Sequence, residues 1–247
     1  MPARARPRLL RPLPGRVGRA LLALSLLLAG PGVAQTITAA EYADPTTRYA
    51  HGILGDAIEH GTLELTLGDG RRLRIVLPET DVFEDTRPRL ADIDGDGAPE
   101  VITVQSSLTQ GARLAIYDST GLVAATPYIG RPNRWLAPIG AADMDGDGRI
   151  EIAYIDRPHL AKTLRLWRFE QGTLVHVADL PGFTNHRIGE TDIAGGLRSC
   201  AGGPEMVVAT ADWSALVAVR YRDRRFETSE IGSDTSRSGF ARALACE

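Results

Sequence analysis

Two short acidic segments carry the residues whose types and spacing could do chemistry. The first runs Asp92-Ile-Asp-Gly-Asp-Gly-Ala-Pro-Glu100, and the second runs Asp143-Met-Asp-Gly-Asp-Gly-Arg-Ile-Glu151. Alternate side chains of a tight loop point inward, so the aspartates of each segment should converge on one point. Carboxylates that lie this close repel one another unless a cation neutralises them. The pattern therefore predicts a metal-binding loop in each segment, with an acidic turn that holds no metal as the alternative.

Hard oxygen ligands favour calcium in these loops, with magnesium as the alternative ion and zinc or copper disfavoured. The predicted ligands of the first site are Asp92, Asp94, Asp96, the carbonyl of Ala98 and Glu100, and those of the second are Asp143, Asp145, Asp147, the carbonyl of Arg149 and Glu151. An EF-hand would place a glutamate at position 12 of each loop and helices on both sides. Thr103 and Tyr154 stand at that position, and strand-like sequence follows, so the EF-hand is excluded.

The acidic segments belong to an internal repeat of about 50 residues. A degraded third copy begins at Asp192, so the leading aspartates of the three copies are 51 and 49 residues apart. Ala194 stands where the second acid should be, and residues 197–203 are an insertion. We therefore expect calcium at the first two loops and a degenerate third site at Asp192.

Each copy continues with sequence that is typical of antiparallel strands. An apolar strand follows each loop, then an alternating strand and then a third short strand. The expected strands are 100–105, 113–118 and 122–126 in the first copy, 151–155, 163–169 and 174–178 in the second, and 205–210, 216–221 and 225–229 in the third. Upstream, 62–67 and 72–77 flank an Asp-Gly turn and predict a hairpin. Residues 240–246 could form a last strand, and no amphipathic helix is expected.

Repeats of three or four strands predict the blades of a propeller. The fold class expected is all-β: a small β-propeller of about four antiparallel blades. The motif Asp-x-Asp-Gly-Asp-Gly-x-x-Glu before an apolar strand resembles the FG-GAP/VCBS repeats of integrin-like β-propellers, clearly at 92–104 and 143–155 and partly at 192–210. The resemblance implies calcium loops that fix blade edges and a ring used for adhesion or ligand binding. Glu100 and Glu151 depart from it, since the family more usually has aspartate there.

The first 34 residues have the three parts of a secretory signal peptide. Six arginines precede an apolar run at 21–29, which is too short to cross a bilayer, and small residues end at Ala34. We expect cleavage after Ala34, then a loosely held N-terminal arm at 35–50 and the propeller at 51–247. The signal peptide predicts a periplasmic or secreted protein, with no transmembrane segment after its removal.

Removal of the signal peptide changes the charge of the chain. The mature part keeps 22 of the 28 basic residues and all 31 acidic ones, a net charge of −9. An acidic surface argues against nucleic acid as a partner. Cys200 and Cys246 are the chain's two cysteines, and an oxidising compartment predicts a disulfide between them, with two free thiols as the alternative.

Other polar residues give weaker signals. The histidines His51, His60, His159, His176 and His186 lack the spacing of a metal site. Asp81, Glu84 and Asp85 lie close together; we interpret them as a solvated loop, with paired carboxylates for hydrolysis as the open alternative. Arg131, Arg134 and the run 220–225 could hold an anionic glycan or a peptide carboxylate, although a solvated strand face is the simpler interpretation. The tryptophans Trp135, Trp167 and Trp213 are expected to pack in the core.

These observations predict an exported calcium-binding β-propeller that acts as a monomeric, non-enzymatic binding or structural module for an unidentified protein or glycan ligand. The alternative is a propeller-framed hydrolase or lyase that acts on glycans or phosphoesters. The catalytic motifs of hydrolases, phosphate-binding loops and zinc proteases are absent from the sequence, which favours the binding module.

Overall fold

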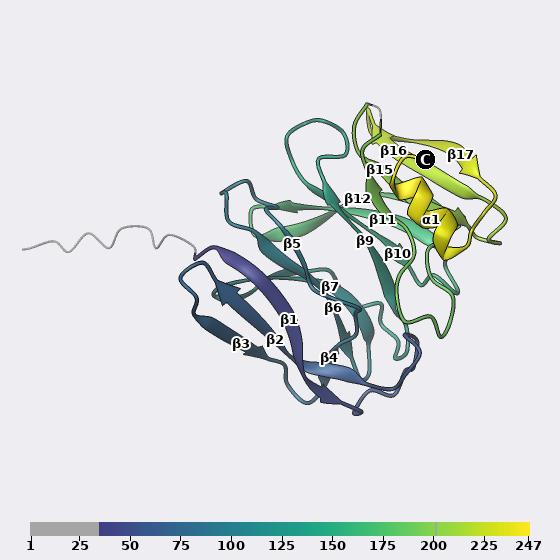
Figure 1. The fold of residues 1–247 in the computed structure, drawn as a ribbon. Helices are drawn as coiled ribbons and strands as arrows, with labels where there is room; N and C mark the ends of the chain where they lie inside the picture. Colours follow the sequence, from purple (N-terminus) through teal and green to yellow (C-terminus); the bar gives the residue numbers. More distant parts are fainter. Residues whose placement is uncertain (1–34, 201) are drawn as a thin grey trace, which may run out of the picture. The chain divides into compact units, whose positions relative to one another are not determined.

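The computed structural model describes residues 35–200 and 202–247 (Figure 1). The predicted signal peptide lies outside these residues. The described chain is all-β except for one short helix, and its strand pairs are antiparallel. Among the described residues, no helix has the length and apolar character needed to span a membrane.

The first sheet, which we call sheet A, contains the N-terminal half of the strands. Its strand order is β1-β2-β4-β6-β7-β8, with β3 beside β2 and β5 beside β6. The bounds are β1 Ile37–Thr46, β2 Glu59–Leu67, β3 Arg72–Val76, β4 Asp81–Phe83, β5 Arg89–Ala91, β6 Glu100–Ser107, β7 Gly111–Asp118 and β8 Gly121–Ala125. The hairpin expected upstream is confirmed as β2 and β3.

Sheets B and C repeat the second part of sheet A. Sheet B has the order β12-β11-β10-β9, and sheet C has the order β13-β15-β16-β17 with β14 beside β15. The bounds are β9 Leu136–Ala142, β10 Glu151–Asp156, β11 Thr163–Glu170, β12 Thr173–Pro181, β13 Phe183–Thr184, β14 Gly196–Arg198, β15 Glu205–Thr210, β16 Leu216–Arg222 and β17 Arg225–Gly232. All nine strands expected after the three loops are confirmed.

The strand that follows each loop is buried on both faces. Every residue of β6 and β10 is buried, and so is all of β15 except Thr210. A strand covered on both faces has a continuous apolar run instead of an alternating one. Side chains of β6, β7, β9 and β10 form one core between sheets A and B, and side chains of β10, β11, β15 and β16 form another between sheets B and C. The loops are thus held at the ends of rigid strands.

The expected last strand at 240–246 is wrong, because this segment is the helix α1, Arg237–Leu244. Ser236 caps the helix, since its side chain accepts a hydrogen bond from the Gly239 N–H at 3.2 Å. Phe240 and Ala243 lie three residues apart, on one helical face, and both are buried against side chains of sheet C. Helix α1 lies beside sheet C in Figure 1. The spacing of these apolar residues therefore fits a helix and not a strand.

The expectation of a loosely held arm is wrong for most of 35–50. Ile37–Thr46 forms β1, which pairs with β2 from Ile37 opposite Leu67 to Thr46 opposite Glu59. Ile37 is buried, whereas most other residues of this strand are partly or fully exposed. An edge strand with one solvated face needs little apolar sequence, so its pattern was weak.

The strands form three hydrogen-bonded sheets and not four separate blades. β4 is the reason, because it pairs with β2 on one side and with β6 on the other. This short strand joins the upstream hairpin to the first acidic repeat. Among the described strands, no pairing connects sheet C to sheet A.

The disulfide predicted from the cysteine count is present. Cys200 and Cys246 are bonded, with their Cα atoms 5.6 Å apart. The bond joins the segment after β14 to the chain end that follows α1. It therefore fastens the helix to the third repeat.

Candidate metal-binding loops

The two acidic loops have the same backbone design. Each leading aspartate accepts hydrogen bonds from two glycine N–H groups, Asp92 from Gly95 at 2.8 Å and Gly97 at 3.0 Å, and Asp143 from Gly146 at 2.8 Å and Gly148 at 2.9 Å. All four glycines have positive φ, between 79° and 89°, a conformation that costs other residues energy. The repeated glycines of the motif are thus explained by the turn.

The closing glutamate of each loop is anchored in the same way. Glu100 accepts a hydrogen bond from the Ile93 N–H at 2.9 Å, and Glu151 accepts one from the Met144 N–H at 2.9 Å. Both carboxyl groups are buried at the start of a central strand, with Glu100 6 % and Glu151 0 % exposed. The glutamates therefore tie each loop to the strand that follows it.

The first loop gathers acids without a basic partner. Carboxylate oxygens of Asp92, Asp94 and Asp96 lie within 4.8 Å of one another. Burial raises the pKa of Glu100 to about 7; the Ile93 N–H opposes this rise, and the neighbouring aspartates add to it. Among the described residues, no lysine, arginine or histidine forms an ion pair with these acids. The donor set, all hard oxygens, fits a divalent cation such as calcium.

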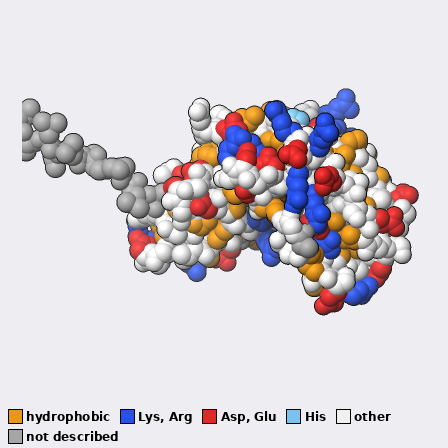
Figure 2. Space-filling model, turned by 90° about the horizontal axis from the view of Figure 1, so that it is seen from above, with side chains coloured by type: hydrophobic (Ala, Val, Ile, Leu, Met, Phe, Trp, Pro, Cys, Tyr) orange, Lys and Arg blue, Asp and Glu red, His pale blue; other side chains and the backbone are white. Residues whose placement is uncertain are grey.

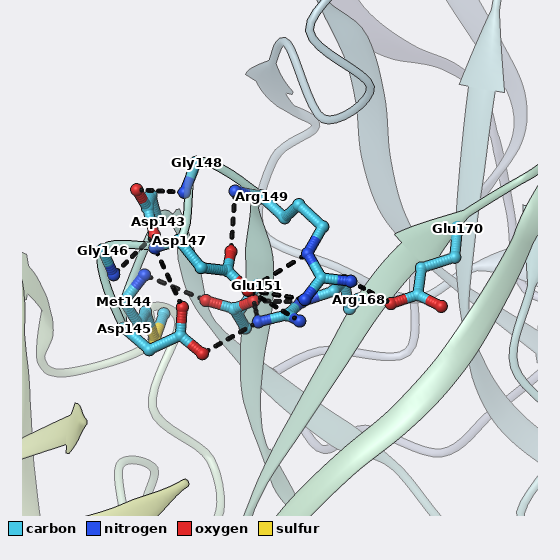
Figure 3. Close-up of polar contacts among 10 residues, drawn as sticks. All are labelled: Asp143, Met144, Asp145, Gly146, Asp147, Gly148, Arg149, Glu151, Arg168 and Glu170. Atoms are coloured by element: carbon cyan, nitrogen blue, oxygen red, sulfur yellow. Dashed lines mark hydrogen bonds and ion pairs between the residues drawn. The ribbon is translucent and has the colours of Figure 1, made fainter. Parts of the chain in front are cut away.

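The second loop gathers acids around an arginine (Figure 3). Asp143, Asp145 and Glu151 offer oxygens within 4.8 Å of one another. Arg168, from β11, pairs with Asp145 at 3.0 Å and also with Glu151. Its N–H groups further reach Asp147 at 3.2 Å. This loop fits a metal less well than the first, because a fixed cation already faces its carboxylates.

Asp147 is drawn away from the other acids of the second loop. Its carboxylate pairs with the Arg149 side chain at 2.6 Å, and Arg149 also reaches Glu170 at 3.0 Å (Figure 3). The hydrogen bond from Arg149 is the main cause that lowers the pKa of Asp147. The backbone N–H groups of Ala98 and Arg149 donate to Asp96 and Asp147 at 2.7 and 2.9 Å. The first and second loops thus differ in charge and not in backbone.

In the part of the third loop that the structure describes, no cluster of acids could hold a metal. Asp192 is 63 % exposed at its side chain and pairs with Arg237 of α1. Glu205, the counterpart of Glu100 and Glu151, is 4 % exposed and pairs with Arg198 at 2.7 Å and with Arg220. The structure therefore places arginines where the first loop has only acids.

The interpretation of Asp81, Glu84 and Asp85 as a solvated loop is wrong, because all three are buried. Each acid has its own partners, some close in sequence and some distant. Asp81 accepts from Tyr128 at 2.6 Å, and Asp85 pairs with Arg89 at 2.7 Å. Burial in separate hydrogen-bond networks explains why these charges are tolerated inside the sheet.

Glu84 lies between two groups that sequence reasoning did not connect with it. His51 Nδ1 is 2.5 Å from one carboxylate oxygen, and the Ser106 hydroxyl donates to the other. A nucleophilic triad needs the histidine between the serine and the acid. Here the acid lies in the middle, so the three residues form a structural network. His51 lies 33 residues before Glu84, so no local sequence pattern indicated this contact.

The remaining predicted residues are distributed as follows. His159 and His186 contact each other at 3.1 Å, and burial lowers the pKa of His159 to about 4. Trp135 is 2 % exposed, as expected for a core residue, and its indole N–H donates to the Glu84 carbonyl at 2.8 Å. Arg134 lines a cavity of about 170 Å³ beside His51. Arg220 and Arg224 lie apart from this cavity, since each lines a different one.

The family comparison can now be set against this geometry. Residues 92–154 match the model of the FG-GAP-like repeat. The matching segment is 63 of the chain's 247 residues. It begins at the first aspartate of the first loop and ends inside β10, so it contains both acidic loops and the strands β6 to β9. The resemblance seen in the motif is thereby confirmed for this part of the chain.

The other comparisons add no relative. The curated proteins and the solved structures that were compared with the chain include no match. The FG-GAP-like match and the loop geometry therefore carry the functional argument.

Proposed function

We propose that this chain is an exported, calcium-stabilised binding module built as a β-propeller of about four blades. The observation that carries the proposal is the first loop, where three carboxylates lie within 4.8 Å of one another. Among the described residues, no basic side chain forms an ion pair with them. Calcium bound by Asp92, Asp94, Asp96 and Glu100 would remove their repulsion and fix the entry of β6.

The FG-GAP-like match supports a propeller-type module, because such repeats form blades. Strands β5 to β8, β9 to β12 and the strands of sheet C each correspond to one blade. The upstream strands β1 to β4 supply the fourth. Because β4 joins this group to sheet A, the proposed module has its first two blades fused.

Export is supported by the disulfide and by the N-terminal sequence. A bond between Cys200 and Cys246 persists in an oxidising compartment such as the periplasm or the outside of the cell. The signal peptide at 1–34, with cleavage after Ala34, would deliver the chain there.

The module acts by binding a protein or a glycan and not by catalysis. A groove of about 910 Å³ supports a ligand face, because it is lined by the first loop at Asp92 and by Arg149 and Phe169 of the next repeat. Acidic and basic side chains are interspersed on the face shown in Figure 2, without the uniform positive field that nucleic acid attracts. The proposed module is a monomer.

Calorimetry of the mature chain tests the calcium proposal. We expect calcium to bind, and chelator to lower the melting temperature by several degrees. Asp92→Asn should remove both effects, because this residue organises the first loop. Glu230→Gln, an exposed acid outside the loops, is the matched control and should change neither. Absence of calcium binding, together with a melting temperature that chelator does not change, would contradict the proposal.

A further inference from the structure

The three repeats place different residues opposite the same buried glutamate. In sheet B, Glu151 is the direct partner of Arg168 across β10 and β11. In sheet C, Glu205 pairs with Arg220 of β16. In sheet A, the register of Val101 opposite Tyr117 continues to Glu100 and Asp118. One structural position thus holds an acid in the first repeat and an arginine in the other two.

Arg168 enters the second loop from inside the sheet. It is only 7 % exposed, and it follows Leu164 and Leu166 on the same inward face of β11. Figure 3 shows its guanidinium beside the carboxylates of Asp145 and Glu151. A buried guanidinium with several carboxylate partners supplies the positive charge that the acids need.

We propose that Arg168 is the resident cation of the second loop, so that calcium binds at the first loop and not at the second. This inference rests on the proposed calcium binding at the first loop. A calcium ion at the second loop would displace the guanidinium from its carboxylates. The arginine would then be buried beside a divalent cation, which is unfavourable. The first loop has no such competitor, because Asp118 stands at the corresponding position.

In the third repeat, too, arginine lies beside the buried glutamate. Glu205 is held by Arg198 and Arg220, and the acids that would line the loop are reduced to Asp192. Arginine therefore accompanies the buried glutamate in the two repeats that lack metal. The first two loops share these backbone hydrogen bonds although only the second faces Arg168.

Calcium stoichiometry of the wild-type chain and of two loop variants tests the inference. We expect one equivalent for the wild type, none for Asp92→Asn and one for Asp143→Asn. Two equivalents for the wild type, of which Asp143→Asn removes one, would overturn the inference and leave the calcium proposal intact. No binding by the wild type would instead overturn the calcium proposal.

Arg168→Gln tests the same inference from the opposite direction. Removal of the guanidinium should open the second loop, so the variant should bind one equivalent more than the wild type. Its melting temperature should fall in chelator and recover in calcium. Arg165→Gln is the matched control, because Arg165 lies on the same strand and pairs with Asp156 and Asp179 instead. An unchanged stoichiometry in folded Arg168→Gln would overturn the inference even if the wild type binds no calcium.

Discussion

Buried carboxyl groups of this chain differ in whether a cation faces them. Arg89 faces Asp85, and Arg168 faces Glu151. Glu59, at the start of β2, is only 2 % exposed and forms no ion pair among the described residues. Burial raises its pKa to about 9, and the charges of Glu84, Asp56 and Asp85 add to the rise. Ionisation of this carboxyl group should therefore oppose folding.

Glu59→Gln should make the protein more stable in mildly alkaline solution. The folded state keeps the Glu59 proton up to a pH of about 9, whereas the unfolded chain loses it near its ordinary value of 4.5. Folded protein binds more protons in this window, so wild-type stability falls as pH rises through it. We expect the variant to gain about 1 to 3 kcal/mol at pH 8 and much less at pH 5.

Urea unfolding at both pH values measures this effect. The exposed Glu230→Gln serves as the control and should follow the wild type. The account would be contradicted if, between pH 5 and 8, the unfolding free energy of the wild type rose relative to that of Glu59→Gln.

The two acidic clusters, Asp92, Asp94 and Asp96 and Asp143, Asp145 and Glu151, were predictable from sequence spacing, but Arg168 was not. Spacing within nine residues identifies Asp92 to Glu100, since the ligands are close in sequence. Arg168 lies 17 residues after Glu151, and only the register of β10 and β11 brings the two together. Its position two residues after Leu166, on the inward face of an alternating strand, was the available signal.

Strands and helix differ in how well their sequences specify them. The central strands were predictable because burial on both faces demands continuous apolar runs. The edge strand β1 was not, because it needs few apolar residues. Helix α1 was missed although Ser236 and the spacing of Phe240 and Ala243 are helix signals. Eight residues are too few for these signals to outweigh an expected strand.

The disulfide should stabilise the last repeat by holding α1 against sheet C. The bond closes a loop of 46 residues, for which chain entropy suggests about 4 kcal/mol. We expect the double variant Cys200→Ser, Cys246→Ser to lose about 2 to 4 kcal/mol of unfolding free energy. In the double variant, the backbone amides of α1 should exchange hydrogen faster than those of β10.

Reductant provides the control for this prediction. It should destabilise the wild type and leave the double variant unchanged. Equal unfolding free energies for the two proteins in oxidising buffer would show that α1 is held by packing alone.

At the scale of the whole molecule, repetition of one unit explains both the sheets and the loops. Each unit supplies a central strand that begins at a buried glutamate: Glu100, Glu151 or Glu205. The number of units was predictable from the 51- and 49-residue spacing of the leading aspartates. The pairing of the upstream strands with the rest of sheet A was not predictable, because it depends on the three-residue strand β4.

A crystal structure of the mature chain grown with calcium, with the ion located by anomalous scattering, tests the central claim most directly. The account predicts one calcium ion in the first loop, bound by Asp92, Asp94, Asp96 and Glu100. It also predicts that the Arg168 guanidinium stays among the carboxylates of the second loop. Absence of calcium from the first loop at saturating concentration would contradict the account.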